Sequence, residues 1–294
     1  MPWLAVAVVL ACLALAGLAY GVFEAGWLRT RVLEVEIPGL PAELDRLRIA
    51  HLSDFHLGAR SRGRISSERA VEWVAARAPD LVCVTGDLVT RPRGEPLLRE
   101  LLARLARPYV VLGNHDVALS RDPFSRAAEL EDLREAVLLR DEAVTFGLGG
   151  RRVQIAGVDP ASYARRRAEP ARLADLDADL RILLCHFPGV GRRLPADAFH
   201  LVLAGHLHAG QINLPYPGGR VTLAHPRARE VQGIYRFPGC TLHVSPGTGT
   251  TFLPLRFFAR PEVTELVLRV APRSDTSSRA PGAGLQSVPW RAIR

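Results

Sequence analysis

The sequence predicts an α/β protein held to a membrane by an N-terminal helix. The segment from Pro2 to Phe23 contains no charged side chain and is rich in Leu, Ala and Val. About 20 apolar residues are enough for a helix to cross a bilayer. Downstream, short apolar runs alternate with stretches of helical spacing, which is typical of α/β architecture. These two patterns predict the fold class.

The N-terminal segment, residues 1–23, is predicted to be a retained anchor. A cleaved signal peptide is the alternative, because residues 14–16 resemble a small-residue cleavage site, but no basic residue precedes the segment. Arg29 and Arg31 follow it. The positive-inside bias therefore favours a single-pass protein of the cell membrane whose soluble part lies in the cytoplasm.

The rest of the chain divides into a connector, one domain and a tail. The connector covers residues 24–45 and is expected to include an edge strand at 32–37. The domain covers residues 46–270. Residues 271–294 are rich in Ser, Pro, Gly and Arg, which predicts a disordered tail.

Helices and strands are expected to follow one another through the domain. Apolar residues at helical spacing predict helices at 66–77, 97–106 and 126–137, the first of them capped by Ser66 or Ser67. From Gly210 onward, Gly- and Pro-rich loops separate short runs such as 241–244 and 263–270. This second half therefore predicts further strands, some of them antiparallel.

Five apolar runs end on residues that can bind metals or transfer protons. The runs are 47–53, 81–85, 109–112, 181–185 and 201–204, and their length and their Val, Leu and Ile content predict buried strands. The residues that follow them are Asp54-Phe55-His56, Gly86-Asp87, Gly113-Asn114-His115-Asp116, His186 and Gly205-His206-Leu207-His208. Because the ends of such strands meet at one rim of a sheet, we expect these side chains to converge.

The residue types at these strand ends suit a two-metal hydrolytic site. The two oxygens of the Asp87 carboxylate can bridge two cations, and Asn114 offers a neutral oxygen ligand. His115 can transfer a proton near neutral pH, and Asp116 can orient an imidazole. Each motif alone also suits a turn or a structural histidine. Five of them at successive strand ends favour the metal site.

The order of these motifs resembles the calcineurin-like metallophosphoesterase superfamily. The resemblance spans residues 47–270. The segment from Val244 to Thr250, continued by Leu253-Pro254-Leu255-Arg256-Phe257, resembles the closing segment of the membrane-anchored bacterial YkuE/YaeI-like phosphodiesterase subgroup. The N-terminal anchor is also similar to that subgroup.

The resemblance implies a four-layer α/β/β/α sandwich with a binuclear metal centre between its two sheets. It implies that one metal is held by Asp54, His56, Asp87 and His208. It implies that the other is held by Asp87, Asn114, His186 and His206, with Asp87 bridging and with His115 as the acid or transition-state stabiliser. Two divalent cations such as Mn, Fe or Zn are the implied cofactors.

One position departs from the family pattern. The family often has an aspartate three residues after the Gly-Asp aspartate, and this chain has Thr90 there. The resemblance implies that this position supports His115. We therefore expect metal binding to survive and the rate or the pKa of His115 to differ.

Composition narrows the possible partners. The chain has 294 residues and a net charge of +8. Its basic residues are all arginine and are spread along the chain without the clustered stripe of a nucleic-acid binder, so no nucleic acid is expected. This charge suits an anionic substrate or membrane surface, but compositional bias is the favoured explanation, because Ala, Arg, Gly, Leu and Pro are abundant throughout. The four cysteines are expected to be free thiols.

The predicted reaction is hydrolysis of a phosphoester by a metal-activated hydroxide. Monoesters, diesters and pyrophosphates all suit such a centre, and the anchor favours a substrate at a membrane, such as UDP-2,3-diacylglucosamine or a phospholipid diester. Candidate substrate contacts are Tyr163, residues 165–167 and the loop 211–220. The alternative is a membrane-tethered binding or scaffold protein that keeps the fold without turnover.

Overall fold

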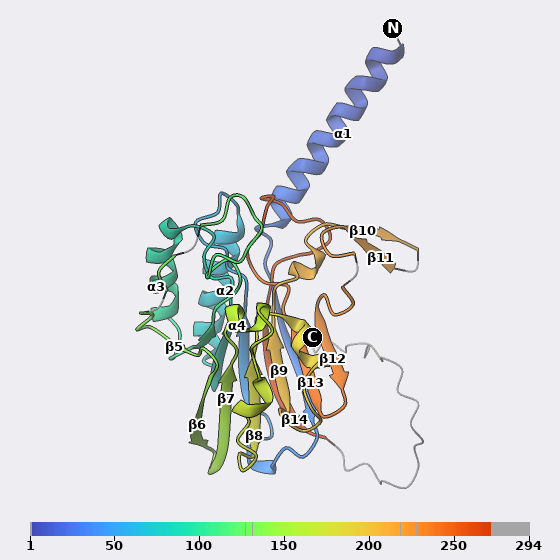
Figure 1. Ribbon diagram of the computed structural model, residues 1–294. Helices are drawn as coiled ribbons and strands as arrows, with labels where there is room; N and C mark the ends of the chain where they lie inside the picture. Colours follow the sequence, from blue (N-terminus) through green and yellow to red (C-terminus); the bar gives the residue numbers. More distant parts are fainter. Residues whose placement is uncertain (1, 127, 131, 218, 227, 272–294) are drawn as a thin grey trace.

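Two six-stranded sheets packed face to face form the body of the protein (Figure 1). The computed structural model describes residues 2–126, 128–130, 132–217, 219–226 and 228–271. The first sheet has the order β1 (Arg29–Ile37), β14 (Glu262–Val270), β2 (Arg48–Leu52), β3 (Leu81–Thr85), β4 (Tyr109–Val111) and β5 (Val137–Leu138). The second has the order β12 (Gly233–Phe237), β13 (Cys240–Val244), β9 (Leu201–Ala204), β8 (Leu180–Leu184), β7 (Arg151–Gly157) and β6 (Glu142–Leu148).

Alternate side chains of each strand fill two different cores. In β3, Cys83 faces the core between the sheets, while Val82 and Val84 face outward. The outward face of the first sheet is covered by α2 (Gly63–Arg77) and α3 (Glu95–Ala103). The outer face of the second sheet is covered by short helices, α4 (Pro160–Ala164), η3 (Pro170–Leu173) and η4 (Pro188–Arg192). These layers confirm the expected α/β/β/α sandwich.

The central strands of both sheets run parallel, as β2–β3–β4 in one and β7–β8–β9–β13 in the other. Their carboxyl ends therefore lie at one end of the sandwich, which also carries the two-stranded hairpin of β10 (Asn213–Tyr216) and β11 (Gly219–Thr222) (Figure 1). We call it the site end.

Helix α1 (Pro2–Glu24) is a candidate membrane span, and it projects from the site end with its apolar side chains exposed (Figure 1). Strand β1 follows directly and forms the edge of the first sheet, and it begins earlier than the predicted strand at 32–37. Residues 272–294, for which a disordered tail was predicted, lie outside the described residues.

Two local predictions are wrong. The described residues between 126 and 136 form turns instead of a helix, and the Arg126 amide donates to the Thr90 carbonyl at 2.8 Å. Their helical spacing arises because Leu130 and Leu133 both pack into the core. Ser66 and Ser67 do not cap α2, which begins at Gly63; both are buried inside the helix, where the Ser66 hydroxyl donates to the Ala25 carbonyl at 3.1 Å.

Strands β6 and β7 were not predicted. They form an antiparallel hairpin whose two turn residues, Gly149 and Gly150, both have positive φ angles, of 58° and 77°. Glycine accepts this geometry without steric cost, and such a turn matches the twist of its strands.

Candidate metal centre

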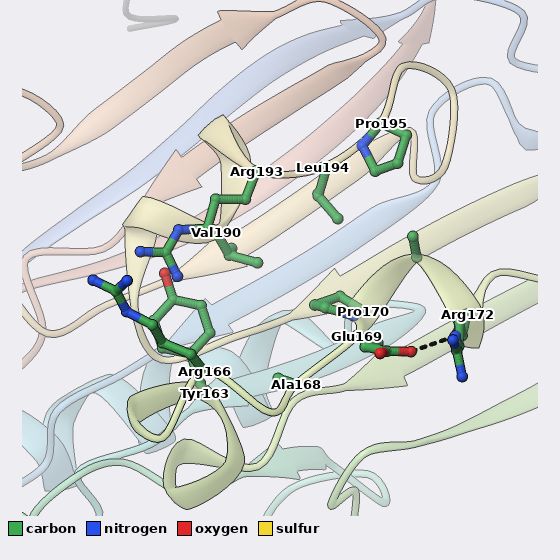
Figure 2. Close-up of a pocket in the computed structure, with 11 residues that line it drawn as sticks. Tyr163, Arg166, Ala168, Glu169, Pro170, Arg172, Val190, Arg193, Leu194 and Pro195 are labelled. Carbon is green, nitrogen blue, oxygen red and sulfur yellow. Dashed lines mark ion pairs between the residues drawn. The ribbon is translucent and has the colours of Figure 1, made fainter.

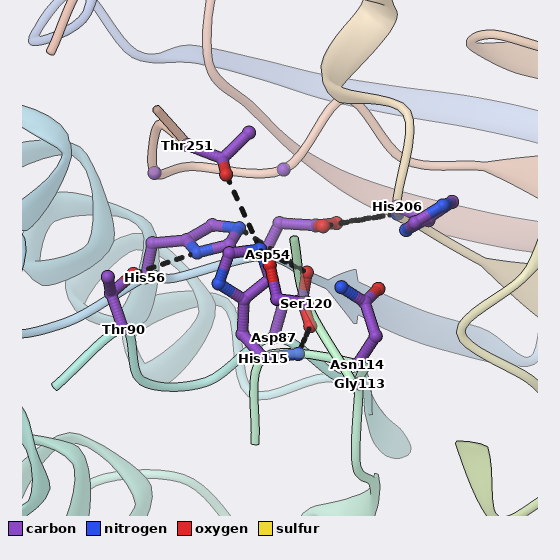
Figure 3. Close-up of polar contacts among 12 residues, drawn as sticks. Asp54, His56, Asp87, Thr90, Gly113, Asn114, His115, Ser120, His206 and Thr251 are labelled. Carbon is purple, nitrogen blue, oxygen red and sulfur yellow. Dashed lines mark hydrogen bonds and ion pairs between the residues drawn. The ribbon is translucent and has the colours of Figure 1, made fainter. Parts of the chain in front are cut away.

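The predicted site residues lie in the loops that leave β2, β3, β4, β8 and β9. Backbone hydrogen bonds hold the first two loops side by side: the Asp54 amide donates to the Gly86 carbonyl at 2.9 Å, and the His56 amide donates to the Asp87 carbonyl at 3.0 Å. The loops thus bring Asp54, His56 and Asp87 to the gap between the sheets (Figure 3).

Two glycines of the motifs allow the side chains of neighbouring loops to lie directly against their backbone. A Cβ atom on Gly113 would overlap the Asp87 carboxylate, and one on Gly205 would overlap the side chains of Ser53 and Asp54. Any side chain at these positions would push a carboxylate out of place. This explains why Gly precedes Asn114 and His206 in the sequence.

Asp54, His56, Asp87 and His208 form the first group of ligand atoms. Atoms from all four lie within 4.8 Å of one another, and all four residues are buried. The Nε2 atoms of His56 and His208 are 3.0 Å apart, and His208 Nε2 is 3.4 Å from Asp54 Oδ1. This group could hold one metal ion.

Asp87, His186 and His206 form a second group within the same distance limit. His186 Nε2 is 3.2 Å from Asp87 Oδ2, 3.1 Å from His206 Nδ1 and 3.1 Å from Asn114 Oδ1. The amide oxygen of Asn114 therefore faces the same space as the ligand atoms of Asp87, His186 and His206. His186 Nδ1 donates to the Thr85 carbonyl at 2.8 Å, which leaves Nε2 free to act as a ligand.

Asp87 belongs to both groups. Its Oδ1 accepts the His115 amide at 2.9 Å, and its Oδ2 lies 3.2 Å from His186 and 3.5 Å from His56. The structure thus brings together all seven residues predicted as ligands, in the two sets that the resemblance implies. The ligand roles themselves stay predictions.

His115 lies beside these groups, with its Nε2 3.9 Å from Asp87 Oδ2 (Figure 3). Three hydroxyl groups surround its ring: Ser125 Oγ lies 3.0 Å from Nδ1, and Ser120 Oγ and Thr251 Oγ1 lie 2.9 and 3.4 Å from Nε2. None of these three residues was predicted from the sequence. Their loops show no spacing that marks them, although Thr251 lies between the two parts of the closing segment, 244–250 and 253–257, that carry the family resemblance.

Thr90 and Asp116 contact other partners than expected. Thr90 Oγ1 lies 3.0 Å from Nδ1 of His56, so it supports a predicted metal ligand and not His115. The Asp116 carboxylate accepts the backbone amides of Leu88, Val89 and Gly113 at 2.8–3.1 Å. It therefore orients no imidazole and instead fixes the loop that carries Asp87.

Burial and mutual contact shift the pKa values of the cluster. Burial raises the pKa of Asp54 to about 6, although the His186 imidazole opposes it. Burial alone would raise the pKa of Asp87, but the imidazoles of His186 and His115 hold it well below its ordinary value. Burial would lower the pKa of His186, but the Asp87 carboxylate more than offsets this and raises it to about 9.

The imidazoles of His56, His206 and His208 favour the neutral form. Burial and the neighbouring His186 lower the pKa of His206 to about 3, and burial holds the pKa values of His56 and His208 well below the ordinary range. The neutral imidazoles of His56 and His208, whose Nε2 atoms face one another at 3.0 Å, are suited to sharing a cation. The donor set of carboxylates, imidazoles and one amide therefore fits divalent transition-metal ions.

Five predicted ligands have strained backbones. Asp54, His56, Asp87, His206 and His208 all have φ between 49° and 76°, a region that residues other than glycine seldom adopt. Such strain tends to occur at functional sites, where surrounding contacts enforce it.

Residue Tyr163, a candidate substrate contact, stacks on Phe187 with ring centroids 4.9 Å apart. Phe187 in turn packs edge-on against His186 and His206. On its other side, Tyr163 lines a cavity of about 670 Å³ with Arg166 and Arg193 (Figure 2). The cavity is thus separated from the metal cluster by the Tyr163–Phe187 stack.

Comparison with known proteins decides the family. Residues 47–210 match the model of the calcineurin-like phosphoesterase family. The chain belongs to this family. It is therefore a metal-dependent phosphoesterase, as the resemblance implied.

Similar proteins occur in bacteria and in animals. The chain is 30% identical over 233 residues to YkoQ of Bacillus subtilis, an uncharacterized metallophosphoesterase, covering 77% of this chain and 84% of YkoQ. It is 28% identical to YkuE of the same organism, covering 78% and 82%. It is 33% identical to a transmembrane protein with metallophosphoesterase domain from Danio rerio, covering 82% of this chain and 58% of that protein.

A buried arginine contacts the group of proposed metal ligands through His208. Arg256 is fully buried, and its guanidinium donates to the carbonyl oxygens of Pro246, Gly249 and Ala259. Its Nη2 also lies 3.1 Å from His208 Nδ1. Arg256 belongs to the closing segment that carries the family resemblance, but no role was predicted for it from the sequence.

Proposed function

We propose that the protein is a membrane-anchored binuclear phosphoesterase that hydrolyses a phosphomonoester, phosphodiester or pyrophosphate bond. The observation that carries the proposal is the position of Asp87, whose carboxylate belongs to both groups of ligand atoms. A carboxylate shared in this way is the bridging ligand that two-metal hydrolysis needs.

Asp54, His56, Asp87 and His208 would hold one divalent cation, and Asp87, Asn114, His186 and His206 would hold the other. When bound, the two cations supply Lewis acidity, which lowers the pKa of water and neutralises phosphate charge. Thr90 and Thr85 orient His56 and His186 for this role through their Nδ1 atoms.

His115 would donate a proton to the leaving oxygen. Its Nε2 points toward the metal cluster and lies within 3.9 Å of Asp87, and Ser125 holds the opposite ring nitrogen. A proton donor beside the reacting phosphate speeds departure of a poor leaving group. Ser120 and Thr251 would keep the Nε2 proton directed into the site.

The substrate proposal follows from α1, which would anchor the enzyme to the cell membrane. A lipid-linked phosphoester such as UDP-2,3-diacylglucosamine, or a phospholipid diester, then lies within reach. We favour a cytoplasmic domain, because Arg62 packs against Gly26 and Arg260 stacks 3.8 Å over the Trp27 ring, adding positive charge next to the helix. Reporter fusions at the C terminus test this orientation.

The reaction is tested with bis-nitrophenyl and mono-nitrophenyl phosphate. We expect nitrophenol release that a chelator abolishes and added metal restores. Asp87→Asn should remove activity and lower the bound metal, measured by mass spectrometry, from two ions per chain. Asp177→Asn is the matched control, because Asp177 is exposed at the opposite end of the sandwich.

A fully active Asp87→Asn enzyme without metal would contradict the proposal. A folded, metal-loaded wild type that turns over none of a panel including UDP-2,3-diacylglucosamine would instead favour the scaffold alternative.

A further inference from the structure

The end of α1 is fastened to the loop before β14. The buried carboxylate of Glu24 accepts the backbone amides of Phe258 and Ala259 at 2.9 and 2.6 Å. The Arg256 amide donates to the Gly21 carbonyl at 2.9 Å. These bonds leave the loop no freedom to move away from the last turns of the helix.

This attachment sets how deeply the loop before β14 lies in a bilayer that α1 crosses. The Phe257 ring lies against Gly21, and a Cβ on Gly17 would be 3.9 Å from it. At 1.5 Å per residue, Gly17 lies about 10 Å inward from Glu24. The apolar part of α1 is roughly 33 Å long on the same scale and only just fills a hydrocarbon core of about 30 Å. If α1 spans a bilayer, Phe257 therefore lies at the edge of the hydrocarbon.

The hairpin β10–β11 is joined to the same loop. The Asn213 amide donates to the Phe257 carbonyl at 2.9 Å, and Figure 1 places the hairpin beside the base of α1. The exposed apolar side chains of the hairpin and the loop form what we call the apolar collar. Its members are 48–56% exposed and comprise Leu214, Tyr216, Val221, Leu223, Phe252, Leu253 and Phe258.

Exposed apolar side chains are concentrated at this end of the sandwich. Beyond α1, the large apolar side chains exposed at the other end, among the residues that the structure describes, are Leu176 and Val270. Large exposed apolar surfaces mark contacts with partners or membranes. Trp27 stacked under Arg260 is the kind of pair found at a membrane surface.

A cavity lies next to the metal cluster, between residues 59–61, 90–91 and 250–254, although none of the proposed metal ligands lines it. It has a volume of about 470 Å³. Its wall includes Thr90 and Thr251, which contact His56 and His115, and also Phe252 and Leu253 of the collar. A molecule in this cavity can place polar groups near the cluster and apolar groups near the collar.

We propose that the apolar collar inserts into the surface of the bilayer that α1 crosses, and that the substrate is a phosphoester of a membrane lipid whose apolar part lies against the collar and this cavity. The inference rests on the membrane anchoring and the reaction proposed above. The collar holds the mouth of the site against the bilayer, so the lipid need not leave its apolar surroundings completely to reach the cluster.

The position of the collar is tested by lipid quenching of a fluorescent label. The full-length Cys12→Ala protein, whose remaining cysteines in the described part are buried, is labelled through Leu214→Cys, or through Leu223→Cys as a second site. Leu10→Cys reports the anchor, and Leu176→Cys is the exposed leucine control. All are placed in phosphatidylcholine–phosphatidylglycerol vesicles containing brominated lipid.

We expect quenching of the Leu10 label by deep bromines, of the collar labels by shallow bromines, and none at Leu176. A collar label that behaves like Leu176, while Leu10 is quenched, overturns the docking and leaves the anchor intact; the collar would then face a protein partner. If Leu10 is also unquenched, the anchoring proposal fails with it.

The substrate class is tested with two nitrophenyl phosphodiesters, one carrying a hexadecyl chain in vesicles and one carrying a methyl group in solution. The Val221→Ser/Leu223→Ser variant, which alters exposed collar residues outside the candidate substrate loop 211–220, should lower turnover of the long-chain ester at least about threefold and leave the methyl ester unchanged. Equal effects on both esters overturn the lipid proposal. No turnover of either ester by the wild type overturns a lipid phosphodiester as the substrate, while the quenching result and the monoester and pyrophosphate reactions of the proposed function stand independently.

Discussion

Replacing Thr90 with valine separates the role seen in the structure from the role implied by the family. Valine has the shape of threonine but lacks the hydroxyl that lies 3.0 Å from His56 Nδ1. Thr90 is only 3% exposed, so water cannot replace the lost hydrogen bond. We expect Thr90→Val to weaken metal binding while the folded domain persists.

The expected loss is about 10- to 100-fold in metal affinity, as is usual when a hydrogen-bond partner of a ligating histidine is removed. This equals about 1.4–2.7 kcal/mol of binding free energy. It is also the cost expected for leaving a buried N–H without an acceptor, roughly 1–3 kcal/mol. At saturating metal, kcat should change little.

The assay is competition for Mn²⁺ with a fluorescent chelator, together with kcat at saturating Mn²⁺. Ser125→Ala is the matched control, because it removes the hydroxyl 3.0 Å from His115 Nδ1 and should lower kcat without changing metal affinity. Unchanged metal affinity combined with a lower kcat in Thr90→Val would refute our reasoning and favour support of His115.

Three further predictions concern the proton donor, the pH response and the anchor. His115→Gln should lower kcat about 10²- to 10³-fold on an alkyl phosphodiester and less on a nitrophenyl ester, with metal content unchanged; equal losses on both esters would exclude a proton donor. The ligand forms of Asp54 and His186 are deprotonated, and their pKa values in the metal-free protein are raised to about 6 and about 9. Metal affinity, measured by calorimetry, should therefore rise about tenfold per pH unit between pH 6 and 9 and more steeply below pH 6; a flat profile would contradict this. Gly21→Leu should overlap the Phe257 ring and destabilise the protein in detergent by about 1–3 kcal/mol, seen as a lower Tm, and an unchanged Tm would argue against this contact.

The strands that carry the site were predictable because they are short, continuously apolar and buried on both faces. The predicted run 81–85 coincides with β3, and 201–204 coincides with β9. The helix at 126–137 was mispredicted because the apolar spacing of Leu130 and Leu133 does not distinguish a helix from a loop that packs both side chains into the core. The hairpin β6–β7 was missed because its strands are only partly apolar, although Gly149 and Gly150 offered a turn signal.

The sequence by itself determined the fold class, the family and the residues that converge at the site, because motif order and strand ends are local properties of the chain. Only the tertiary structure decided which groups touch. It placed Thr90 next to His56 and Asp116 next to backbone amides. It surrounded His115 with the hydroxyls of Ser120 and Ser125 from the loop that follows it and of Thr251 from a distant loop. It also fastened the last turns of α1 to the loop before β14, which brings the metal site close to the end of the predicted membrane helix. These contacts join residues up to 235 positions apart, and no periodicity or local motif records such pairings.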